Sequence, residues 1–207
     1  MSVAAPSAGA IQRGDLLFTA APGALDELPQ PFVVAGRLPR LLRQLQARDP
    51  DVAILGFGLG AVGALMLEQR PGMRLVGVEP DQALASAIPE PLRRRVEIES
   101  IDALTFLRRT RRRFDLVFDD CFVLAGGDAV RPAELTRHAG LVARRLRAGG
   151  VYVRNLLPGP GLSVADQSRD LSSRFPHVAL RTFREWENVF AVASARPIRS
   201  GWRSRLY

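Results

Sequence analysis

Acidic side chains follow three strand-like runs of this sequence: Glu79, Asp102, and the adjacent pair Asp119 and Asp120. A carboxylate at the end of a strand can accept both hydroxyl groups of a ribose, or a proton from a nucleophile. Successive strand residues face opposite ways, so we expect only Asp120 of the pair to point into a site. The plainer alternatives are an exposed Glu79 without a ligand, a helix N-cap at Asp102 and a loop cap at Asp120. The pattern predicts a site that binds a nucleoside and orients a nucleophile.

A glycine-rich stretch after a short, β-branched apolar run provides a second part of this site. Gly56, Gly58, Gly60 and Gly63 allow a tight turn from a strand into a helix and a close approach of the backbone to a ligand. The first three are typical of a nucleoside-binding loop, whereas the last three also match the dinucleotide-binding pattern. Glu79 follows Gly58 by 21 residues, where both NAD and S-adenosylmethionine enzymes carry a ribose-binding carboxylate.

A sheet must bring these side chains together. Strand-like and helical segments alternate with short connections, which predicts an α/β fold with a parallel sheet covered by helices. In such a fold the carboxyl ends of the strands meet at one edge, where ligands bind. The strands are predicted at residues 52–55, 75–79, 96–99, 115–118, 151–154, 178–183 and 189–193, and the helices at 60–69, 82–88, 103–109, 133–147 and 164–175. Before them, residues 15–19 are expected to form an edge strand and residues 37–47 a helix.

The 207 residues favour a single main domain. We predict a flexible tail at 1–14, an amino-terminal strand/helix extension at 15–48, a nucleoside-binding domain at 49–196 and a basic tail at 197–207.

Localisation is predicted from three further features. The lone cysteine, Cys121, cannot form an internal disulfide, the first residues do not match a secretion signal, and the longest apolar stretch, 52–67, is short for a membrane span. We therefore expect a cytoplasmic protein that does not bind membranes. The two histidines, His138 and His177, lack metal-ligand spacing with Cys121, so no metal site is expected.

The net charge is +8, and all 29 basic residues are arginine because the sequence contains no lysine. This composition is as typical of biased codon usage as of selection for phosphate contacts. Arginine is densest at 93–95 and 108–113, where we expect solvated helix ends or loops, with an anionic substrate or effector site as the first alternative. No aromatic residues interleave these arginines as a stacking surface requires, so a nucleic-acid partner is not expected.

The order of the motifs resembles the class I S-adenosylmethionine-dependent methyltransferase fold, and within it the spermidine synthase-like branch. The resemblance covers residues 50–195 and rests on the segments AILGFGLG, LVGVEPD, RVEIESIDALTFL, FDLVFDD, LRAGGVYVRNLL and ENVFAVAS. It implies a Rossmann-like, doubly wound sheet of seven strands, mostly parallel with an antiparallel last strand, and helices on both faces. It also implies S-adenosyl-L-methionine or its decarboxylated form as cofactor, Asp120 as the catalytic residue, and cofactor contacts from Gly56, Phe57, Gly58, Gly60, Glu79, Pro80, Asp102, Ala103 and Asp119.

Two positions depart from the aminopropyltransferases of that branch. Those enzymes carry an acidic residue inside the glycine motif, where this chain has Leu59, and a second Asp three residues after the catalytic one, where it has Val123. A cationic polyamine needs carboxylates to replace its water. We therefore predict methyl transfer from S-adenosylmethionine to a small molecule, with acceptor-pocket loops at 122–132 and 155–162.

Other functions stay open. An aminopropyltransferase would use decarboxylated S-adenosylmethionine, and a binding module would keep the nucleoside site without catalysis. An RNA methyltransferase is suggested only by the arginine excess. An NAD enzyme fits less well, because it does not predict Asp102 or the Asp119–Asp120 pair. A homodimer face, at the amino-terminal sheet edge or the helix 133–147, is also open.

Overall fold

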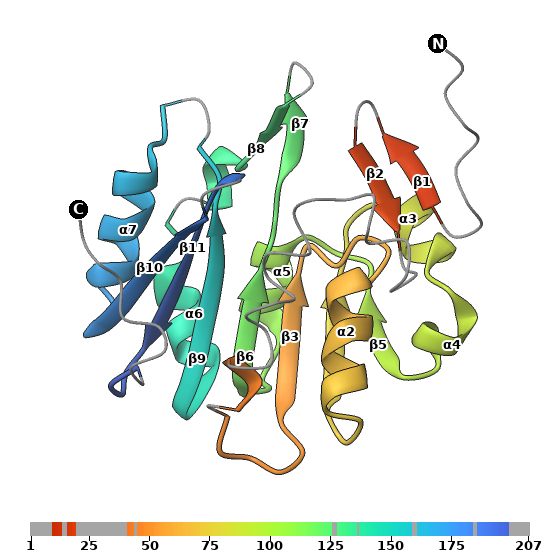
Figure 1. Cartoon of the computed structure of the whole chain (residues 1–207), viewed down its shortest axis with the longest axis horizontal. Coiled ribbons are helices and arrows are strands. Elements are labelled where there is room, and N and C mark those ends of the chain that lie inside the picture. The colour runs from red at the N-terminus through yellow and green to blue at the C-terminus, as the bar shows by residue number, and fades with distance from the viewer. Residues whose placement is uncertain are drawn as a thin grey trace.

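The computed structural model describes residues 10–13, 16–19, 41–43, 45–125, 128–135, 137–158, 161–183 and 186–198. Seven strands form the main sheet, in the spatial order β10 (His177–Phe183), β11 (Trp186–Ser194), β9 (Leu146–Leu156), β6 (Phe114–Asp119), β3 (Asp51–Leu55), β4 (Arg74–Val78) and β5 (Val96–Glu99) (Figure 1). β11 runs antiparallel to both of its neighbours, and the other pairs are parallel. The predicted seven-stranded sheet with an antiparallel last strand is confirmed.

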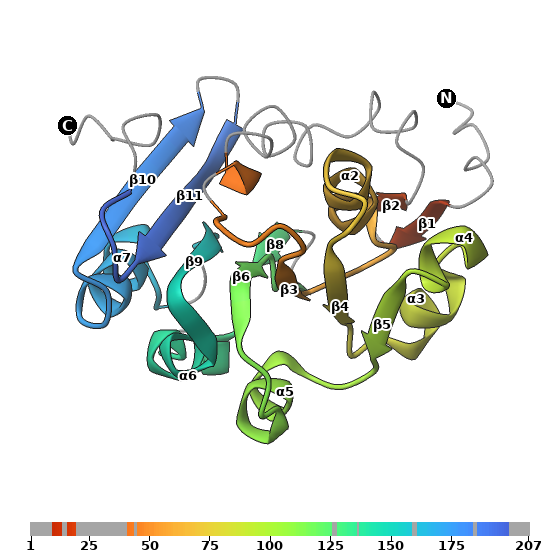
Figure 2. The ribbon, with the colours of Figure 1, turned by 90° about the horizontal axis from the view of Figure 1, so that it is seen from below.

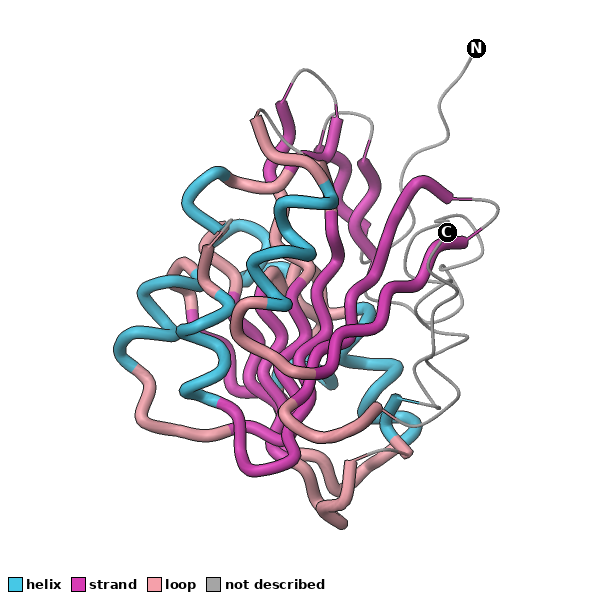
Figure 3. The backbone as a smooth tube through the Cα atoms, turned by 90° about the vertical axis from the view of Figure 1, so that its left-hand side faces the viewer, coloured by secondary structure: helices cyan, strands magenta, loops and turns pink. Residues whose placement is uncertain are grey.

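Helices cover both faces of this sheet, so its central strands are buried on both sides. All five residues of β3 are buried: Val52 and Ile54 belong to one core cluster, and Ala53 and Leu55 to the other. α2 (Ala61–Gln69) covers one face, and α5 (Ala103–Arg109), α6 (Ala139–Arg145) and α7 (Val164–Ser172) cover the opposite face (Figure 2). Seen along the row of strands, most helices gather on one side of the sheet (Figure 3).

The predicted helix 133–147 is wrong as a single element. The chain forms a short 3-10 helix, η2 (Ala133–Leu135), then α6, and enters β9 at Leu146. Gly149 and Gly150 therefore lie inside the strand. A Cβ on Gly150 would lie 2.9 Å from the carbonyl oxygen of Phe114 on β6, so glycine permits the close approach at the register shift between these strands. The predicted helix 82–88 is α3 (Gln82–Ala87), followed by a short α4 (Glu90–Arg93).

Two hairpins lie outside the main sheet. Residues 16–19 form β2 (Leu16–Thr19), which pairs with β1 (Ala10–Arg13), so this segment is not an edge strand of the main sheet as predicted. Residues 122–132, predicted as a loop, contain β7 (Val123–Ala125) and β8 (Asp128–Val130), which extend beyond the carboxyl end of β6 (Figure 1). Residues 45–47 are not helical, so the predicted helix 37–47 ends earlier. Within the described ranges, no helix is long and apolar enough to cross a membrane.

Candidate active site

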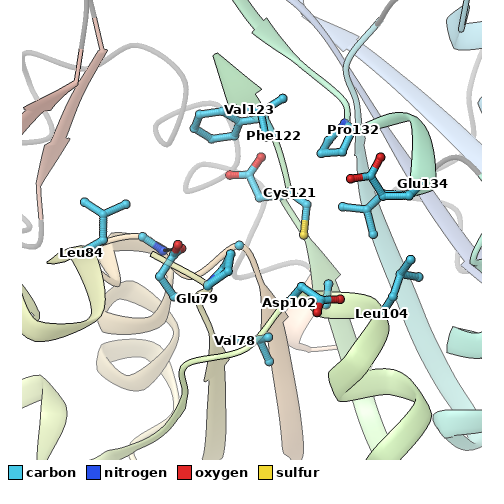
Figure 4. A pocket seen from close by; sticks show the side chains of 16 residues that line it. Val78, Glu79, Leu84, Asp102, Leu104, Cys121, Phe122, Val123, Pro132 and Glu134 are labelled. Carbon is cyan, nitrogen blue, oxygen red and sulfur yellow. Dashed lines mark hydrogen bonds between the residues drawn. The ribbon is translucent and has the colours of Figure 1, made fainter. Parts of the chain in front are cut away.

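A cavity of about 270 Å³ opens at the carboxyl ends of β3, β4 and β6, where the predicted nucleoside site belongs. Seven of the ten predicted site residues line it: Gly56, Gly58, Glu79, Pro80, Asp102, Ala103 and Asp120. Figure 4 shows Glu79 and Glu134 on opposite sides of the cavity. The structure therefore brings together side chains that are separated by more than fifty positions in the sequence.

The glycine loop lies against the segment that carries Asp120. Gly56 has a φ of 76°, and a Cβ there would lie 2.7 Å from the backbone oxygen of Asp120. The backbone N–H of Asp120 donates to the carbonyl of Leu55 over 2.9 Å, and the backbone N–H groups of Gly56 and Phe57 both donate to the carbonyl of Val78. Glycine is needed at position 56 for two reasons: its φ lies in the left-handed region, and the backbone of Asp120 leaves no room for a Cβ.

Phe57 does not line the cavity, although it was predicted to contact the cofactor. Its side chain is buried beneath the loop, and a Cβ on Gly77 would lie 2.5 Å from its ring. A Cβ on Gly63 or on Gly60 would lie 2.7 Å from the same ring. Gly60 and Gly63, two of the three glycines that match the dinucleotide pattern, thus make room for a phenylalanine of the core. Gly60 does not line the cavity either.

Glu79 is buried at the end of β4 and joins two loops. The backbone N–H of Gly58 donates to its Oε2 over 2.8 Å, and the backbone N–H of Asp81 donates to its Oε1 over 3.0 Å. Burial raises the pKa of Glu79 above its ordinary value, although these two hydrogen bonds act in the opposite direction. The carboxylate is thus fixed beside the glycine loop, and it lines the cavity.

Asp102 is both a helix cap and a lining residue of the cavity. The backbone N–H of Thr105 donates to Asp102 Oδ1 over 2.9 Å, so Asp102 is the N-cap of α5. Hydrogen bonds from Thr105 lower the pKa of Asp102 from its ordinary value. The same residue lines the cavity, next to Ala103 and Leu104. An ionised carboxylate there can accept a hydrogen bond from an amine of a ligand.

Asp120 lines the cavity and Asp119 does not, as expected for two successive residues. Asn155, at the carboxyl end of β9, donates from Nδ2 to Asp120 Oδ1 over 2.8 Å. Burial raises the pKa of Asp120 to about 6, while the hydrogen bond from Asn155 acts in the opposite direction. A carboxylate with this pKa is suited to accept a proton near neutral pH.

Asp119 was predicted to contact the cofactor, but its side chain is fully buried between the sheet and α6. Its Oδ2 accepts hydrogen bonds from Arg131 Nη2 at 2.6 Å and from Tyr152 Oη at 2.5 Å, and His138 Nε2 lies 2.8 Å away. Burial acts to raise the pKa of Asp119, but Arg131, His138 and Arg154 hold it well below its ordinary value.

Arg131 connects this buried cluster to the wall of the cavity. The residue follows β8, and its guanidinium donates to the carbonyls of Leu135, Cys121 and Asn155 over 3.1, 3.4 and 3.4 Å as well as to Asp119. It therefore holds the base of the β7–β8 hairpin against the segments on both sides of Asp120. Sequence reasoning missed this residue, because one arginine among 29 carries no local signal of burial.

The hairpin and η2 complete the wall with residues that were not predicted individually. Phe122, Val123 and Pro132 fall within the predicted acceptor loop 122–132, whereas Glu134 and Leu135 lie just after it. The second predicted loop, 155–162, contributes no lining residue among its described positions. Asn155 affects the cavity only indirectly, through its hydrogen bond to Asp120. The charged residues of the lining are all acidic: Glu79, Asp102, Asp120 and Glu134.

The surroundings of two other side chains account for them without a role in chemistry. Leu59 is buried against Leu84 and Ala87, so apolar packing accounts for it. Cys121 lines the cavity, and burial together with Asp119 raises the pKa of its thiol well above the ordinary value, which opposes a role as nucleophile. Over the described ranges, no group of three or more His, Cys, Asp or Glu side chains is arranged to hold a metal ion.

No protein-family model matches the sequence, and no curated protein matches it. Solved structures do match the fold. Human methyltransferase-like protein 13 in complex with SAH aligns with a TM-score of 0.65 at 17% identity, over 86% of this chain and 83% of that one. The O-methyltransferase TomG from Streptomyces achromogenes, in complex with SAM, aligns with a TM-score of 0.60 at 19% identity, over 84% and 86%.

A probable spermidine synthase from Corynebacterium glutamicum aligns with a TM-score of 0.68 at 23% identity, over 83% of this chain. The chain spans 65% of the length of that protein. These similarities, together with the strand order and the position of the cavity, show that the chain has the class I S-adenosylmethionine-dependent methyltransferase fold, which the spermidine synthases share.

Proposed function

We propose that this protein is a transferase that binds S-adenosyl-L-methionine and methylates a small molecule. The observation that carries the proposal is that one cavity is lined by Glu79 and Asp102, for the nucleoside, and by Asp120, whose pKa is raised to about 6. The solved structures with SAH and SAM that share this fold support the choice of cofactor.

The residues present fit this cofactor. Glu79 is fixed by two backbone hydrogen bonds and still lines the cavity, so its oxygens are available to ribose hydroxyls beside Gly56 and Gly58. Asp102 and Ala103 then face the base. The cofactor supplies an electrophilic methyl group, so the protein mainly has to align a nucleophile and exclude water. Asp120 orients that nucleophile and accepts its proton.

The acceptor should be neutral or cationic. The charged lining residues are all carboxylates, and an anionic acceptor would be repelled in a partly desolvated cavity. This argument disfavours phosphate-bearing acceptors, which includes RNA, as the substrate of this site.

Glu134 favours aminopropyl transfer as the second candidate function. Val123 stands where aminopropyltransferases carry their second carboxylate, but η2 brings Glu134 to the cavity, across from Glu79 (Figure 4). A cationic amine could therefore contact both Asp120 and Glu134. The product separates the two functions, because methyl transfer leaves S-adenosylhomocysteine and aminopropyl transfer leaves methylthioadenosine.

Calorimetry tests the nucleoside site first. The ligands are S-adenosylmethionine, S-adenosylhomocysteine, decarboxylated S-adenosylmethionine, methylthioadenosine and NAD. We expect the first two to bind, and binding to be lost in Glu79→Gln but kept in Glu99→Gln, a matched change at the end of β5 outside the cavity. Preference for the decarboxylated pair would favour aminopropyl transfer. If no ligand binds, the proposal is wrong.

Asp120→Asn then separates an enzyme from a binding module. We expect this variant to bind S-adenosylhomocysteine as the wild type does and to lose transfer by about 10²–10⁴-fold, the usual contribution of a positioned proton acceptor. Glu134→Gln should mainly raise the KM for the acceptor. An unchanged rate in Asp120→Asn would contradict the assigned role.

A further inference from the structure

A group of arginines lies at the amino ends of the parallel strands. The cavity lies at their carboxyl ends, on the opposite side of the molecule. Arg108 and Arg109 end α5, which leads to the start of β6, and Arg144 and Arg145 end α6, which leads to the start of the neighbouring strand β9. Arg145 Nε donates to the carbonyl of Leu107 over 2.9 Å. This hydrogen bond holds the two arginine-bearing helix ends side by side.

The acidic side chains at the amino ends of β3, β5 and β6 are already paired. Their partners are arginines of the same edge: Asp51 with Arg74 and Arg147, Asp115 with Arg147, and Glu97 with Arg112. Arg74, Arg112 and Arg147 thus have a structural role here, as Arg145 does through its hydrogen bond to Leu107. Because Asp51, Asp115 and Glu97 are occupied by these ion pairs, none of the three neutralises the remaining arginines.

Five arginines therefore form an uncompensated positive surface, which we call the arginine surface: Arg108, Arg109, Arg111, Arg113 and Arg144. All five are exposed, and within the described ranges their side chains have no ion pair. The only large apolar side chain that is exposed among the described residues is Val123, at the cavity end of the molecule. The arginine surface thus has charge without an apolar component.

We propose that the arginine surface binds the phosphate backbone of double-stranded nucleic acid without reading its sequence. Protein interfaces have an apolar core, and stable attachment to an anionic membrane takes an inserted apolar group or lipid besides basic residues. Neither is present on the described part of this surface. A nucleic-acid duplex carries one negative charge about every 1.7 Å of its axis. Binding that does not depend on sequence comes almost entirely from contacts between these phosphates and basic side chains.

The absence of interleaved aromatic residues, which argues against stacking of single-stranded bases, agrees with contacts to phosphates only. The arginine surface and the acidic cavity lie at opposite ends of the parallel strands. The duplex is therefore a separate partner and not the acceptor, and the inference does not depend on the proposed transferase activity.

Fluorescence anisotropy with short labelled RNA and DNA duplexes tests this inference on the full chain. Five phosphate contacts predict a slope of log K against log salt of about −4.5, hence about 500-fold weaker binding at about 200 mM than at about 50 mM NaCl. The variant Arg109→Gln/Arg113→Gln/Arg144→Gln should reduce this loss to about 12-fold. The control Arg137→Gln/Arg169→Gln/Arg174→Gln removes the same charge from exposed positions elsewhere.

The inference is supported if the first triple variant binds more weakly with a shallower salt dependence while the control behaves like the wild type. Equal weakening in both triple variants would overturn it, because net charge alone would then explain binding. Failure of the wild type to bind either duplex at about 50 mM NaCl would also overturn it. Binding to phosphatidylserine vesicles without binding to duplexes would assign the surface to a membrane instead.

Discussion

Asn155 and Asp120 are joined by a hydrogen bond of 2.8 Å between two neighbouring strand ends. Asn155 is buried at the end of β9, and Asp120 directly follows β6. Burial raises the pKa of the Asp120 carboxyl to about 6, and the amide of Asn155 stabilises its ionised form. The pair thus sets the pH at which the proposed proton acceptor becomes available.

Asn155→Leu removes this donor with little change in volume. We expect the pKa of Asp120 to rise above about 6, so the acidic limb of kcat/KM against pH moves to higher pH. Binding of S-adenosylhomocysteine should stay the same, because Asn155 does not line the cavity. A profile measured from acidic to neutral pH checks this shift, and an unmoved limb would show that Asn155 does not position Asp120.

The raised pKa of Asp120 lowers the stability of the folded protein at neutral pH. A carboxyl whose pKa is higher in the folded state than in the unfolded state stabilises the fold less as pH rises between the two values, here from 3.8 to about 6. At about 1.36 kcal/mol per pKa unit, this amounts to about 2–3 kcal/mol at neutral pH. Asp120→Asn should therefore be more stable than the wild type near pH 7 and equally stable near pH 4.

Urea unfolding at these two pH values measures the difference. Asp166→Asn is a suitable control, because Asp166 is a partly exposed carboxyl whose pKa is lowered to about 2 by hydrogen bonds from Ser163, so its replacement should destabilise the protein near pH 7. The same stability of Asp120→Asn and the wild type at both pH values would contradict a raised pKa in the folded state.

The sequence was sufficient to predict the sheet and the acidic side of the cavity. Both depend on local patterns: apolar runs between turns give the strands, and Glu79, Asp102 and Asp120 come directly at or after strand ends. In a parallel sheet the carboxyl ends of neighbouring strands lie side by side, so residues at these ends come together once the strands are assigned. The surroundings of Asp119 and Glu134 depend instead on the path of the chain after the β7–β8 hairpin, which places Arg131 on Asp119 and Glu134 at the cavity. No local sequence pattern predicts that path.

Arg131→Met is expected to destabilise the protein strongly. The change leaves the fully buried Asp119 carboxylate without the guanidinium that lies 2.6 Å from it, and loss of one partner of a buried ion pair costs about 3–5 kcal/mol. Arg169→Met removes an exposed arginine paired with Asp166 and should cost at most about 1 kcal/mol. Urea unfolding compares the two. Similar small losses would show that Arg131 does not hold the hairpin.

Phe57 shows what a glycine pattern alone does not determine. The family resemblance implied a cofactor contact at Phe57, which lies between Gly56 and Gly58. Its ring instead fills the space left by the absent side chains of Gly63 and Gly77. A glycine pattern predicts close approach, but it does not distinguish a ligand from a neighbouring side chain.

Gly77→Ala tests this packing, because the added methyl group would lie 2.5 Å from Cγ of Phe57. Overpacking of this kind costs about 1–3 kcal/mol, and the displaced loop should also weaken binding of S-adenosylhomocysteine. In the Phe57→Leu background the same substitution should cost less, which a double-mutant cycle measures as a coupling between the two positions. Gly140→Ala in α6, where the nearest atom is 3.4 Å away on the flexible Arg174 side chain, should be neutral or stabilising. Equal costs of Gly77→Ala with and without the phenylalanine would mean that the strand itself, and not Phe57, requires the glycine.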